Sequence, residues 1–437
     1  MKTGGRLEAA IEVLAEIETR HRPAADALKD WGSAHRFAGS GDRAAIGNLV
    51  YDALRHRASV AWRMGEATPR AVVLGTLAWT WGQGLAGVEA ALADPHAPAA
   101  LSDAERERLA NATLDGAPAD VRGDYPAWLD TAFERVFGDR AAEEGRALAE
   151  RAPVDLRCNT LKTNPDKALK GFAEFGAKPG ALSPLAIRIP LPGGPGRAPH
   201  VESEPAYLKG QVEIQDEGSQ LAALVAAAHA GSQVLDLCAG GGGKTLALAA
   251  AMANKGQIYA YDADKRRMRD IFERSKRAGA HNIQVRTPGR ADVLADLAGR
   301  MDLVLVDSPC TGTGTWRRRP DAKWRLTEAQ LDARMQEQDA VLDQAAAYVK
   351  PGGHLVYVTC SLLAEENEDR VAAFLARVPD FDLIEPLAAM ERTDPATAAR
   401  LAPFVRRGER ASPVLRLSPA SAGTDGFFVA VLRREAR

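Results

Sequence analysis

Two cysteines stand out as residues that could form a covalent bond to a substrate. Cys310 lies in Asp307-Ser-Pro-Cys-Thr-Gly-Thr-Gly314 and Cys360 in Val358-Thr-Cys-Ser361, each just after an apolar run that predicts a β-strand. Because the carboxyl ends of parallel strands lie at one edge of a sheet, we expect both thiols at that edge. A single cysteine after a strand is usually small buried filling. Two beside one cofactor site favour nucleophilic chemistry by a thiolate.

A glycine-rich turn earlier in the chain predicts a bound cofactor. The segment Asp236-Leu-Cys-Ala-Gly-Gly-Gly-Gly-Lys-Thr245 follows the predicted strand Gln233–Leu237. Glycines let the backbone approach a ligand closely, and the following helix directs its N-terminal amides towards it. Three cofactor classes compete for this turn: a nucleoside triphosphate, a dinucleotide and S-adenosylmethionine.

The first two classes match the turn incompletely. Gly243-Lys244-Thr245 fits the end of the phosphate-binding motif GxxxxGK[ST], and Leu303–Asp307 could serve as the acidic strand of an NTPase. However, Cys238 replaces the leading glycine of that motif. In the dinucleotide motif GxGxxG, the third glycine would fall on Thr245.

Three acidic residues favour S-adenosylmethionine. Asp262 follows the glycines by roughly 20 residues, the usual place of an acid that accepts hydrogen bonds from ribose hydroxyls. Asp292 follows the third predicted strand and Asp307 the fourth, so all three carboxylates should lie at the ligand-binding edge. Each acid alone could be a helix cap or a solvated loop residue. The predicted cofactor site consists of Cys238, Ala239, Gly240, Gly241, Gly242, Gly243, Lys244, Asp262, Arg267, Asp292 and Asp307.

The elements around these residues alternate between short apolar strands and longer helices from about Gln211 onwards. Such alternation is typical of a mostly parallel sheet covered on both faces. A β-prone run near the C-terminus could add an antiparallel edge strand. The predicted strands are Gln233–Leu237, Gln257–Tyr261, Ile283–Val285, Leu303–Val306, His354–Val358 and Gly426–Leu432.

The preceding half of the chain predicts different structure. Residues 7–112 show helical periodicity, for example at Leu7, Ile11 and Leu14. A small α/β unit follows, with a strand at Val154–Leu161 and a helix at Asp166–Phe175, and then a proline- and glycine-rich linker at Pro190–Pro199. We therefore predict three domains: a helical domain over 1–120, a small α/β domain over 121–205 and an α/β domain over 206–437.

Composition narrows the functional class. The 437 residues carry a net charge of −2, so any nucleic-acid surface must be local. Four single cysteines and eight scattered histidines predict neither disulfides nor a metal site. No apolar run approaches a membrane span, so we expect a cytoplasmic protein, by default a monomer. One basic run with interleaved tryptophans could bind RNA or be a solvated loop: Trp316, Arg317, Arg318, Arg319, Lys323, Trp324 and Arg325.

These segments together resemble the RsmB/NOP/Sun family of S-adenosylmethionine-dependent RNA (cytosine-5)-methyltransferases. The family marks are a DxPCSGxG loop and a TCS loop, and both are present, with Thr311 for the usual serine. The resemblance spans about residues 125–433, and Gly41-Asp-Arg43 with Tyr51-Asp-Ala-Leu-Arg55 is similar to the NusB-like domain of the ribosomal-RNA branch. It implies a Rossmann-like class I methyltransferase sheet, a small α/β RNA-binding subdomain and an N-terminal NusB-like helical domain. Further matching segments are Leu156–Lys162, Gln215–Gln220, Arg319–Arg325, Glu365–Asn367 and Gly423–Phe428.

The resemblance also implies roles for single residues. The Cys360 thiolate would add to carbon 6 of cytosine and activate carbon 5 towards the methyl group. A protonated Asp307 would donate to ring nitrogen 3, Cys310 would assist release of the product, and Lys323 would position the base or a phosphate. The cytosine must be unstacked, so we expect single-stranded or loop RNA, with Trp316 or Trp324 stacking on neighbouring bases.

One departure concerns the cofactor turn, which reads CAAPGGKT in the family. Gly240 and Gly241 stand here for the alanine and the proline. Because glycine loses more entropy on ordering, we expect a looser loop and weaker cofactor binding.

Three alternatives stay open. A DNA cytosine-5 methyltransferase would use the Pro-Cys thiol, but its ENV-type motif is missing and the Thr-Cys loop disfavours it. A P-loop nucleotide-binding protein or a non-catalytic RNA-binding module is disfavoured by the paired cysteines. Ribosomal RNA is favoured over transfer RNA as substrate by the NusB-like start alone.

Overall fold

The computed structural model describes residues 1–289, 292–408 and 412–436, and its chain forms two compact units. The first unit consists of Met1–Ala152, Leu191–Pro199 and Thr315–Leu326. The second consists of Pro153–Pro190, His200–Gly314 and Thr327–Arg437. Residues 121–152, which the sequence assigns to the small α/β domain, thus pack with the N-terminal helices.

The first unit is helical, and its core is formed by apolar faces at helical spacing. Leu7 and Leu14 of α1 pack in one buried cluster with Ile46 and Leu49 of α3 and Val73 of α5. Among the described residues of the chain, no helix combines the length and apolarity that crossing a bilayer requires. The helices are α1 (Thr3–Arg20), α2 (Ala24–Ala34), α3 (Ser40–Arg55), α4 (Arg57–Met64), α5 (Pro69–Gly75), α6 (Gly84–Leu92), α7 (Asp103–Asn111), α8 (Ala119–Gly123), α9 (Asp130–Phe137), α10 (Ala141–Ala149) and α16 (Pro320–Arg325).

A buried carboxylate ties the linker to this helical unit. Asp52 accepts hydrogen bonds from Arg151 and from Trp81 Nε1, the latter at 2.8 Å. Arg151 also donates to the carbonyl of Gly194, and Asn48 donates to the same carbonyl at 3.1 Å. The proline- and glycine-rich linker therefore lacks regular structure, as predicted, yet its carbonyls are satisfied by side chains.

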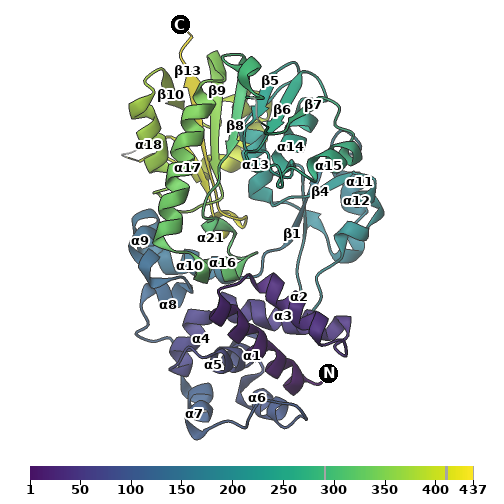
Figure 1. Ribbon diagram of the computed structural model, residues 1–437, viewed down its shortest axis with the longest axis vertical. Coiled ribbons are helices and arrows are strands. Elements are labelled where there is room, and N and C mark those ends of the chain that lie inside the picture. The colour runs from purple at the N-terminus through teal and green to yellow at the C-terminus, as the bar shows by residue number, and fades with distance from the viewer. Residues whose placement is uncertain (290–291, 409–411, 437) are drawn as a thin grey trace. The chain divides into compact units, whose positions relative to one another are not determined.

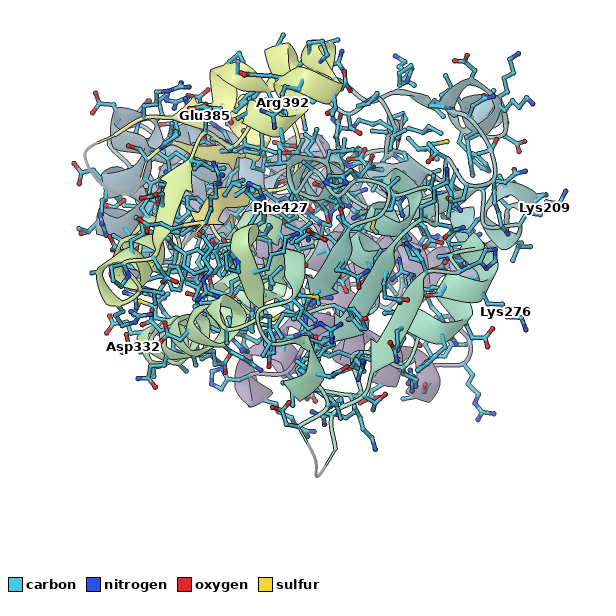
Figure 2. All side chains as sticks on the ribbon, turned by 90° about the horizontal axis from the view of Figure 1, so that it is seen from above. Lys209, Lys276, Asp332, Glu385, Arg392 and Phe427 are labelled. Carbon is cyan, nitrogen blue, oxygen red and sulfur yellow. The ribbon has the colours of Figure 1, made fainter. Side chains whose placement is uncertain are left out.

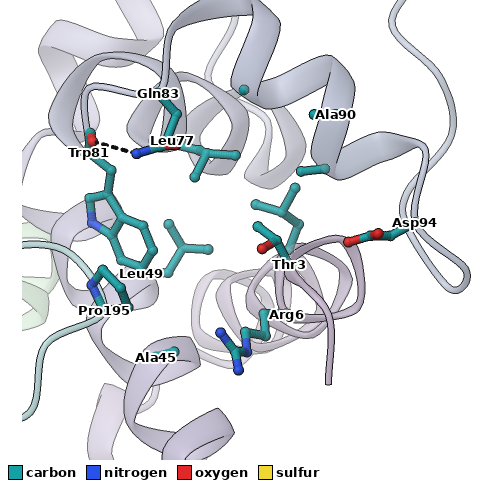
Figure 3. A pocket seen from close by; sticks show the side chains of 13 residues that line it. Thr3, Arg6, Ala45, Leu49, Leu77, Trp81, Gln83, Ala90, Asp94 and Pro195 are labelled. Carbon is teal, nitrogen blue, oxygen red and sulfur yellow. Dashed lines mark hydrogen bonds between the residues drawn. The ribbon is translucent and has the colours of Figure 1, made fainter.

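The first unit also contains a pocket of about 380 Å³ (Figure 3). Leu49, Leu77 and the ring of Trp81 supply apolar walls, and Arg6 and Asp94 add charged groups. None of the site residues predicted from the sequence lines this pocket.

A four-stranded antiparallel sheet opens the second unit. Its order is β2-β3-β1-β4, and its own apolar core includes Leu156, Phe172 and Ile187. The predicted strand at Val154 and the helix after it are present, although the helix ends earlier than expected. The elements are β1 (Val154–Cys158), α11 (Pro165–Lys170), β2 (Lys178–Pro179), β3 (Ala186–Ile189), α12 (Pro205–Leu208) and β4 (Val212–Ile214).

The larger sheet of the second unit has the order β11-β12-β13-β9-β8-β5-β6-β7, with β10 also paired to β13 (Figure 1). The five neighbouring strands from β9 to the edge strand β7 are parallel, which confirms the predicted mostly parallel sheet. Those five are β5 (Gln233–Asp236), β6 (Gln257–Tyr261), β7 (Ile283–Arg286), β8 (Met301–Asp307) and β9 (Val349–Thr359). The others are β10 (Phe381–Ile384), β11 (Val405–Arg406), β12 (Val414–Leu417) and β13 (Phe427–Arg434).

Helices cover both faces of this sheet because successive strand residues point to opposite sides. Leu305 packs in one cluster with residues of α13 and α14, whereas Val306 packs in another with residues of α17 and α18. The helices of this unit are α13 (Glu217–Val225), α14 (Gly243–Ala251), α15 (Ile271–Ala278), α17 (Glu328–Ala346), α18 (Glu368–Arg377), α19 (Ala388–Thr393), α20 (Pro395–Leu401) and α21 (Pro419–Ala422).

One prediction about the sheet needs correction. The C-terminal strand β13 is antiparallel to β9, as expected, but it does not form the edge. Its outer side pairs with β12 along Phe427–Val429 and with β10 along Val431–Arg434. These partners, of four residues each, were not predicted from the sequence.

Candidate active site

The two predicted thiols lie next to each other. Cys310 follows β8 and Cys360 follows β9, and these strands pair in parallel with Asp307 opposite Val358. The sulfur atoms of Cys310 and Cys360 are 3.3 Å apart. The hydrogen bond to Cys360 and then burial raise the pKa of Cys310 well above its usual range, so Cys310 stays a thiol.

A buried carboxylate joins the loops that carry the cysteines. Glu366, which has no exposed surface, accepts hydrogen bonds from the Thr311 amide at 2.8 Å and from the Thr311 and Ser361 hydroxyls. Gln338 of α17 donates to the same carboxylate at 3.0 Å. Thr311 and Ser361 each directly follow one of the cysteines, so Glu366 fixes the spacing between the thiols.

Two glycines let a third segment approach these loops. The Gly314 amide donates to the Cys360 carbonyl at 2.9 Å, and the Gly426 amide donates to the Gly314 carbonyl at 2.8 Å. A Cβ atom on Gly314 would lie 2.6 Å from the Gly426 backbone. Side chains at either position would separate the start of β13 from the Cys310 loop.

Asp307 forms an ion pair at the end of β8. The Nζ atom of Lys244 lies 2.7 Å from Asp307 Oδ2 and 5.1 Å from the centre of the Phe427 ring. Lys244, predicted as a cofactor contact, thus binds the carboxylate that the resemblance assigns to catalysis. Because Asp307 keeps about a third of its side chain exposed, the pair is open to a ligand.

Asp236 lies beneath the cofactor turn without any exposed surface. Its Oδ2 atom accepts a hydrogen bond from the Thr245 hydroxyl at 2.6 Å, and Oδ1 has no partner among the described residues. Burial raises the pKa of Asp236 to about 7, and the nearby Asp307 carboxylate adds to this effect.

The glycine turn uses the conformational freedom of two of its glycines. Gly240 has φ +50° and Gly242 has φ +83°, and a Cβ atom on Gly242 would lie 2.6 Å from Ile271 Cγ1. The turn closes with a hydrogen bond from the Gly242 amide to the Ala239 carbonyl. The carbonyl of Gly241 accepts a 2.6 Å hydrogen bond from Arg274.

The acids predicted to bind the cofactor follow β6 and β7 as expected. Asp262 accepts hydrogen bonds from the Gly240 amide at 3.0 Å and from the Asp264 amide at 2.9 Å, and Arg267 lies 3.3 Å away. Asp292 accepts from the Leu294 amide at 3.0 Å. Carboxylates beside a close-approach glycine turn provide acceptors for ribose hydroxyls, so these residues fit a nucleoside cofactor.

Comparison with known proteins identifies the family. The family model "16S rRNA methyltransferase RsmB/F" matches residues 223–433. Ribosomal RNA small subunit methyltransferase B of Sodalis glossinidius is 32% identical over 340 residues, which cover 77% of this chain and 69% of that protein. The chain belongs to the RsmB/F methyltransferase family.

Two further similarities agree with this family. The methyltransferase of the same name from Salmonella typhi is 34% identical over 283 residues, which cover 64% of this chain and 64% of that protein. The match therefore spans slightly less than two thirds of that relative. The crystal structure of a methyltransferase homologue from Pyrococcus horikoshii is 26% identical with a TM-score of 0.57, and covers 72% of this chain and 97% of that one.

Membership of the RsmB/F family excludes the NTPase interpretation of the glycine turn. The geometry agrees, because Lys244 is paired with Asp307. Among the described residues, no group of three or more His, Cys, Asp or Glu side chains is arranged to hold a metal ion.

Lys323 belongs to the first unit, and the two cysteines belong to the second. Its side chain is 1% exposed, and Nζ donates to the Arg55 carbonyl at 3.0 Å. Burial lowers the pKa of Lys323 to about 8. A role for Lys323 in positioning the substrate stays a prediction, and it would require the side chain to leave this site.

The tryptophans of the basic run are structural in this unit. Trp316 is 1% exposed and its ring stacks on Phe133 at 6.0 Å, so the prediction that it stacks on RNA bases is wrong. Trp324 is partly buried, and its Nε1 donates to the Leu54 carbonyl at 2.6 Å. Burial of these large apolar rings among the helices stabilises the first unit, so the rings are not available to stack on RNA bases.

Three residues that position the site were missed by sequence reasoning. Glu366 entered only as part of a matching segment, and Arg274 and Glu213 were not considered. Glu213 of β4 is buried and lies 3.0 Å from Arg274, which in turn binds the cofactor turn. A buried acid and its partner arginine come from separate elements, so no local pattern could have paired them.

Proposed function

We propose that the protein transfers a methyl group from S-adenosylmethionine to carbon 5 of a cytosine in ribosomal RNA, through a covalent adduct on Cys360. The observation that carries the proposal is the pair of thiols 3.3 Å apart beside Asp307, at the carboxyl edge of a methyltransferase sheet. Two adjacent thiols allow one to attack the base while the other handles a proton.

The different environments of the thiols support this division of roles. The Cys360 thiolate attacks carbon 6 of cytosine, which makes carbon 5 nucleophilic. S-adenosylmethionine supplies the methyl group as an electrophilic sulfonium. A base then takes the proton from carbon 5, and the electron pair of that C–H bond restores the double bond between carbons 5 and 6 and expels Cys360 as a thiolate. The Cys310 thiol, 3.3 Å away and kept protonated by its raised pKa, assists this release by donating a hydrogen bond to the departing sulfur.

Asp307 and Lys244 handle the charge that develops on the base. Attack at carbon 6 pushes electrons towards ring nitrogen 3, which must accept a proton or a hydrogen bond. The ammonium of Lys244 holds protons 2.7 Å from Asp307, so the pair can deliver one to nitrogen 3. Phe427 beneath Lys244 excludes water from one side of this pair.

The glycine turn and the acids that follow it would hold the cofactor. Asp262 and Asp292 would accept hydrogen bonds from its nucleoside, and the Gly240–Gly243 backbone would contact its amino-acid end. Ribosomal RNA is the proposed substrate because the matched relatives are ribosomal RNA small subunit methyltransferases.

The test is methyl transfer from labelled S-adenosylmethionine to an unmodified transcript of small-subunit ribosomal RNA, with unmodified transfer RNA in parallel. We expect Cys360→Ala to abolish transfer. We expect Cys310→Ala to accumulate a covalent protein–RNA adduct that survives denaturing electrophoresis. Cys158→Ala is the matched control, because Cys158 is buried in the four-stranded sheet.

The outcomes separate chemistry from substrate. Residual transfer by Cys360→Ala at the wild-type rate would disprove the covalent role of Cys360. Label at cytosine in transfer RNA alone would leave the chemistry intact and overturn the ribosomal assignment. Cofactor binding without transfer to either RNA would refute the proposed function.

A further inference from the structure

The second unit has a basic cleft that the methyl-transfer site does not use. This cleft encloses about 570 Å³ and is bounded by the segment before β4 on one side and by α15 on the other. Its lining residues are Lys162, Leu208, Lys209, Glu273, Arg274, Lys276 and Arg277. Five of these seven side chains are basic and one is acidic, so the cleft carries a strong positive charge.

The cleft contains more basic side chains than the helix dipole of α15 explains. Basic residues near the end of a helix offset its dipole, which accounts for Lys276 and Arg277 at the end of α15. The helix dipole does not account for Lys162, which follows β1, or for Lys209, which follows α12. Over residues 265–277, which include α15 and the segment before it, seven of thirteen side chains are Lys or Arg and two are acidic, so the excess of positive charge extends beyond the cleft.

The acidic groups beneath the cleft do not neutralise it. Glu213 lies 3.0 Å from Arg274 and 2.6 Å from Arg277, so one carboxylate serves two guanidinium groups. Lys209 and Lys276 are exposed, form no ion pair within the described residues, and extend outward on the same side in Figure 2. An anion entering the cleft would therefore meet ammonium groups that are free to bind it.

The cleft is rigid. Lys162 Nζ donates to the carbonyls of Lys209 and Arg277, at 3.0 and 2.5 Å, and thereby bridges the two walls. Asn159 Nδ2 makes the same kind of bridge to Gly210 and Ala278, at 2.8 Å each. Because the walls are fixed before a ligand arrives, little ordering entropy is lost on binding.

Exposed apolar side chains lie beside the charges. Leu208 is 62% exposed and Phe272 is 55% exposed, and the Arg277 guanidinium stacks on the Tyr207 ring at 4.0 Å. A basic groove with exposed apolar and aromatic surfaces is the pattern that binds single-stranded RNA, with phosphates on the cations and bases on the apolar groups.

We propose that this cleft binds backbone phosphates of the RNA substrate. The inference rests on the proposed function, which supplies the RNA, and it adds a docking surface away from the cysteines. Arg274 connects the two sites, because it lines the cleft and also holds the Gly241 carbonyl of the cofactor turn. The cleft and the cofactor turn therefore share this one side chain, which Glu213 already holds in place.

The experiment measures RNA affinity by fluorescence anisotropy at several salt concentrations. The probes are an unmodified transcript of small-subunit ribosomal RNA and an unrelated single-stranded oligouridylate. Lys209→Gln and Lys276→Gln are tested singly and together. Lys255→Gln is the matched control, because Lys255 is exposed in the turn before β6 and does not line the cleft.

We expect the double variant to bind both RNAs more weakly, on the order of tenfold at low salt. The slope of log Kd against log salt should fall by about 0.7 for each lost phosphate contact. Lys255→Gln should match wild type, and all variants should bind S-adenosylmethionine normally. Unchanged RNA affinity and salt slope in the double variant would overturn the proposal. The same result is expected if the cleft binds an acidic protein instead of RNA.

The result is independent of the methyl-transfer assay. Wild type that binds RNA through the cleft but transfers no methyl group would refute the proposed function and leave the cleft assignment standing. If wild type methylates RNA and the cleft variants bind and react normally, the proposed function stands and the cleft assignment is refuted.

Discussion

The pKa of Asp236 gives a quantitative test of the site's electrostatics. The side chain is fully buried below the cofactor turn, and burial raises its pKa from the ordinary 3.8 to about 7. Thr245 and Lys244 favour the charged form, and Asp307 and Asp262 disfavour it. We predict that Asp236→Asn changes the pH dependence of stability and not only its level.

The raised pKa of Asp236 determines whether its contribution to stability grows or falls with pH. Because the folded protein holds this proton more tightly than the unfolded chain, the stabilisation is complete below pH 3.8 and is lost as the pH rises through about 7. At about 1.4 kcal/mol for each tenfold change in proton affinity, the whole effect amounts to about 4 kcal/mol. About 2.5 kcal/mol of it falls between pH 5 and pH 8. Asparagine does not titrate, so this slope disappears in the variant.

The assay is urea unfolding at pH 5, 6, 7 and 8, followed by far-ultraviolet circular dichroism and by tryptophan fluorescence. All seven tryptophans lie in the first unit, so fluorescence reports on that unit and dichroism on both. We expect the gap between Asp236→Asn and wild type to change with pH by dichroism only. Asp264→Asn is the control, because hydrogen bonds from Arg266 hold the pKa of the partly exposed Asp264 at about 2. Parallel stability curves for wild type and Asp236→Asn would refute the reasoning.

Two further substitutions test the geometry of the site. Glu366→Gln replaces one oxygen that accepts from Thr311 and Ser361, so we expect kcat to fall on the order of a hundredfold with cofactor affinity retained; an unchanged kcat would show that the clamp is dispensable. Gly242→Ala adds a Cβ atom 2.6 Å from Ile271 at φ +83°, so calorimetry should show weaker cofactor binding and a loss of stability of about 1 to 3 kcal/mol. Gly243→Ala, whose Cβ atom would meet nothing closer than 3.9 Å, should behave as wild type, and equal effects of the two would contradict this account.

The sequence predicted the parallel sheet and its two thiols because these depend on local patterns. Each central strand is an apolar run, and the residue that ends a parallel strand must lie at the carboxyl edge. The presence of both thiols at this edge followed from this rule, and the pairing of β8 with β9 makes their sulfur atoms neighbours. The short antiparallel strands β10, β11 and β12 were not predicted.

The sequence does not reveal the burial of a residue whose environment comes from distant segments. Trp316 and Lys323 lie in a run that looks exposed, yet both are buried among helices more than 170 residues earlier in the chain. A charge pattern shows which residues are polar, but it does not show which element will cover them. The same limit hid Glu366, whose four hydrogen-bond donors come from three separate segments.

The glycine turn illustrates how distant contacts change a prediction made from local entropy. Replacing the family's alanine and proline with Gly240 and Gly241 predicts a looser loop with weaker cofactor binding. In the structure the Gly240 amide is held by Asp262 and the Gly241 carbonyl by Arg274, at 3.0 and 2.6 Å.

Each of these hydrogen bonds involves a charged side chain, and such bonds contribute roughly 1.5 to 3 kcal/mol, against about 0.5 to 1 kcal/mol for the flexibility of one extra glycine. Arg274 is in turn fixed by the buried carboxylate of Glu213. The balance therefore favours an ordered turn, so removal of Arg274, rather than the presence of the glycines, is what should loosen it.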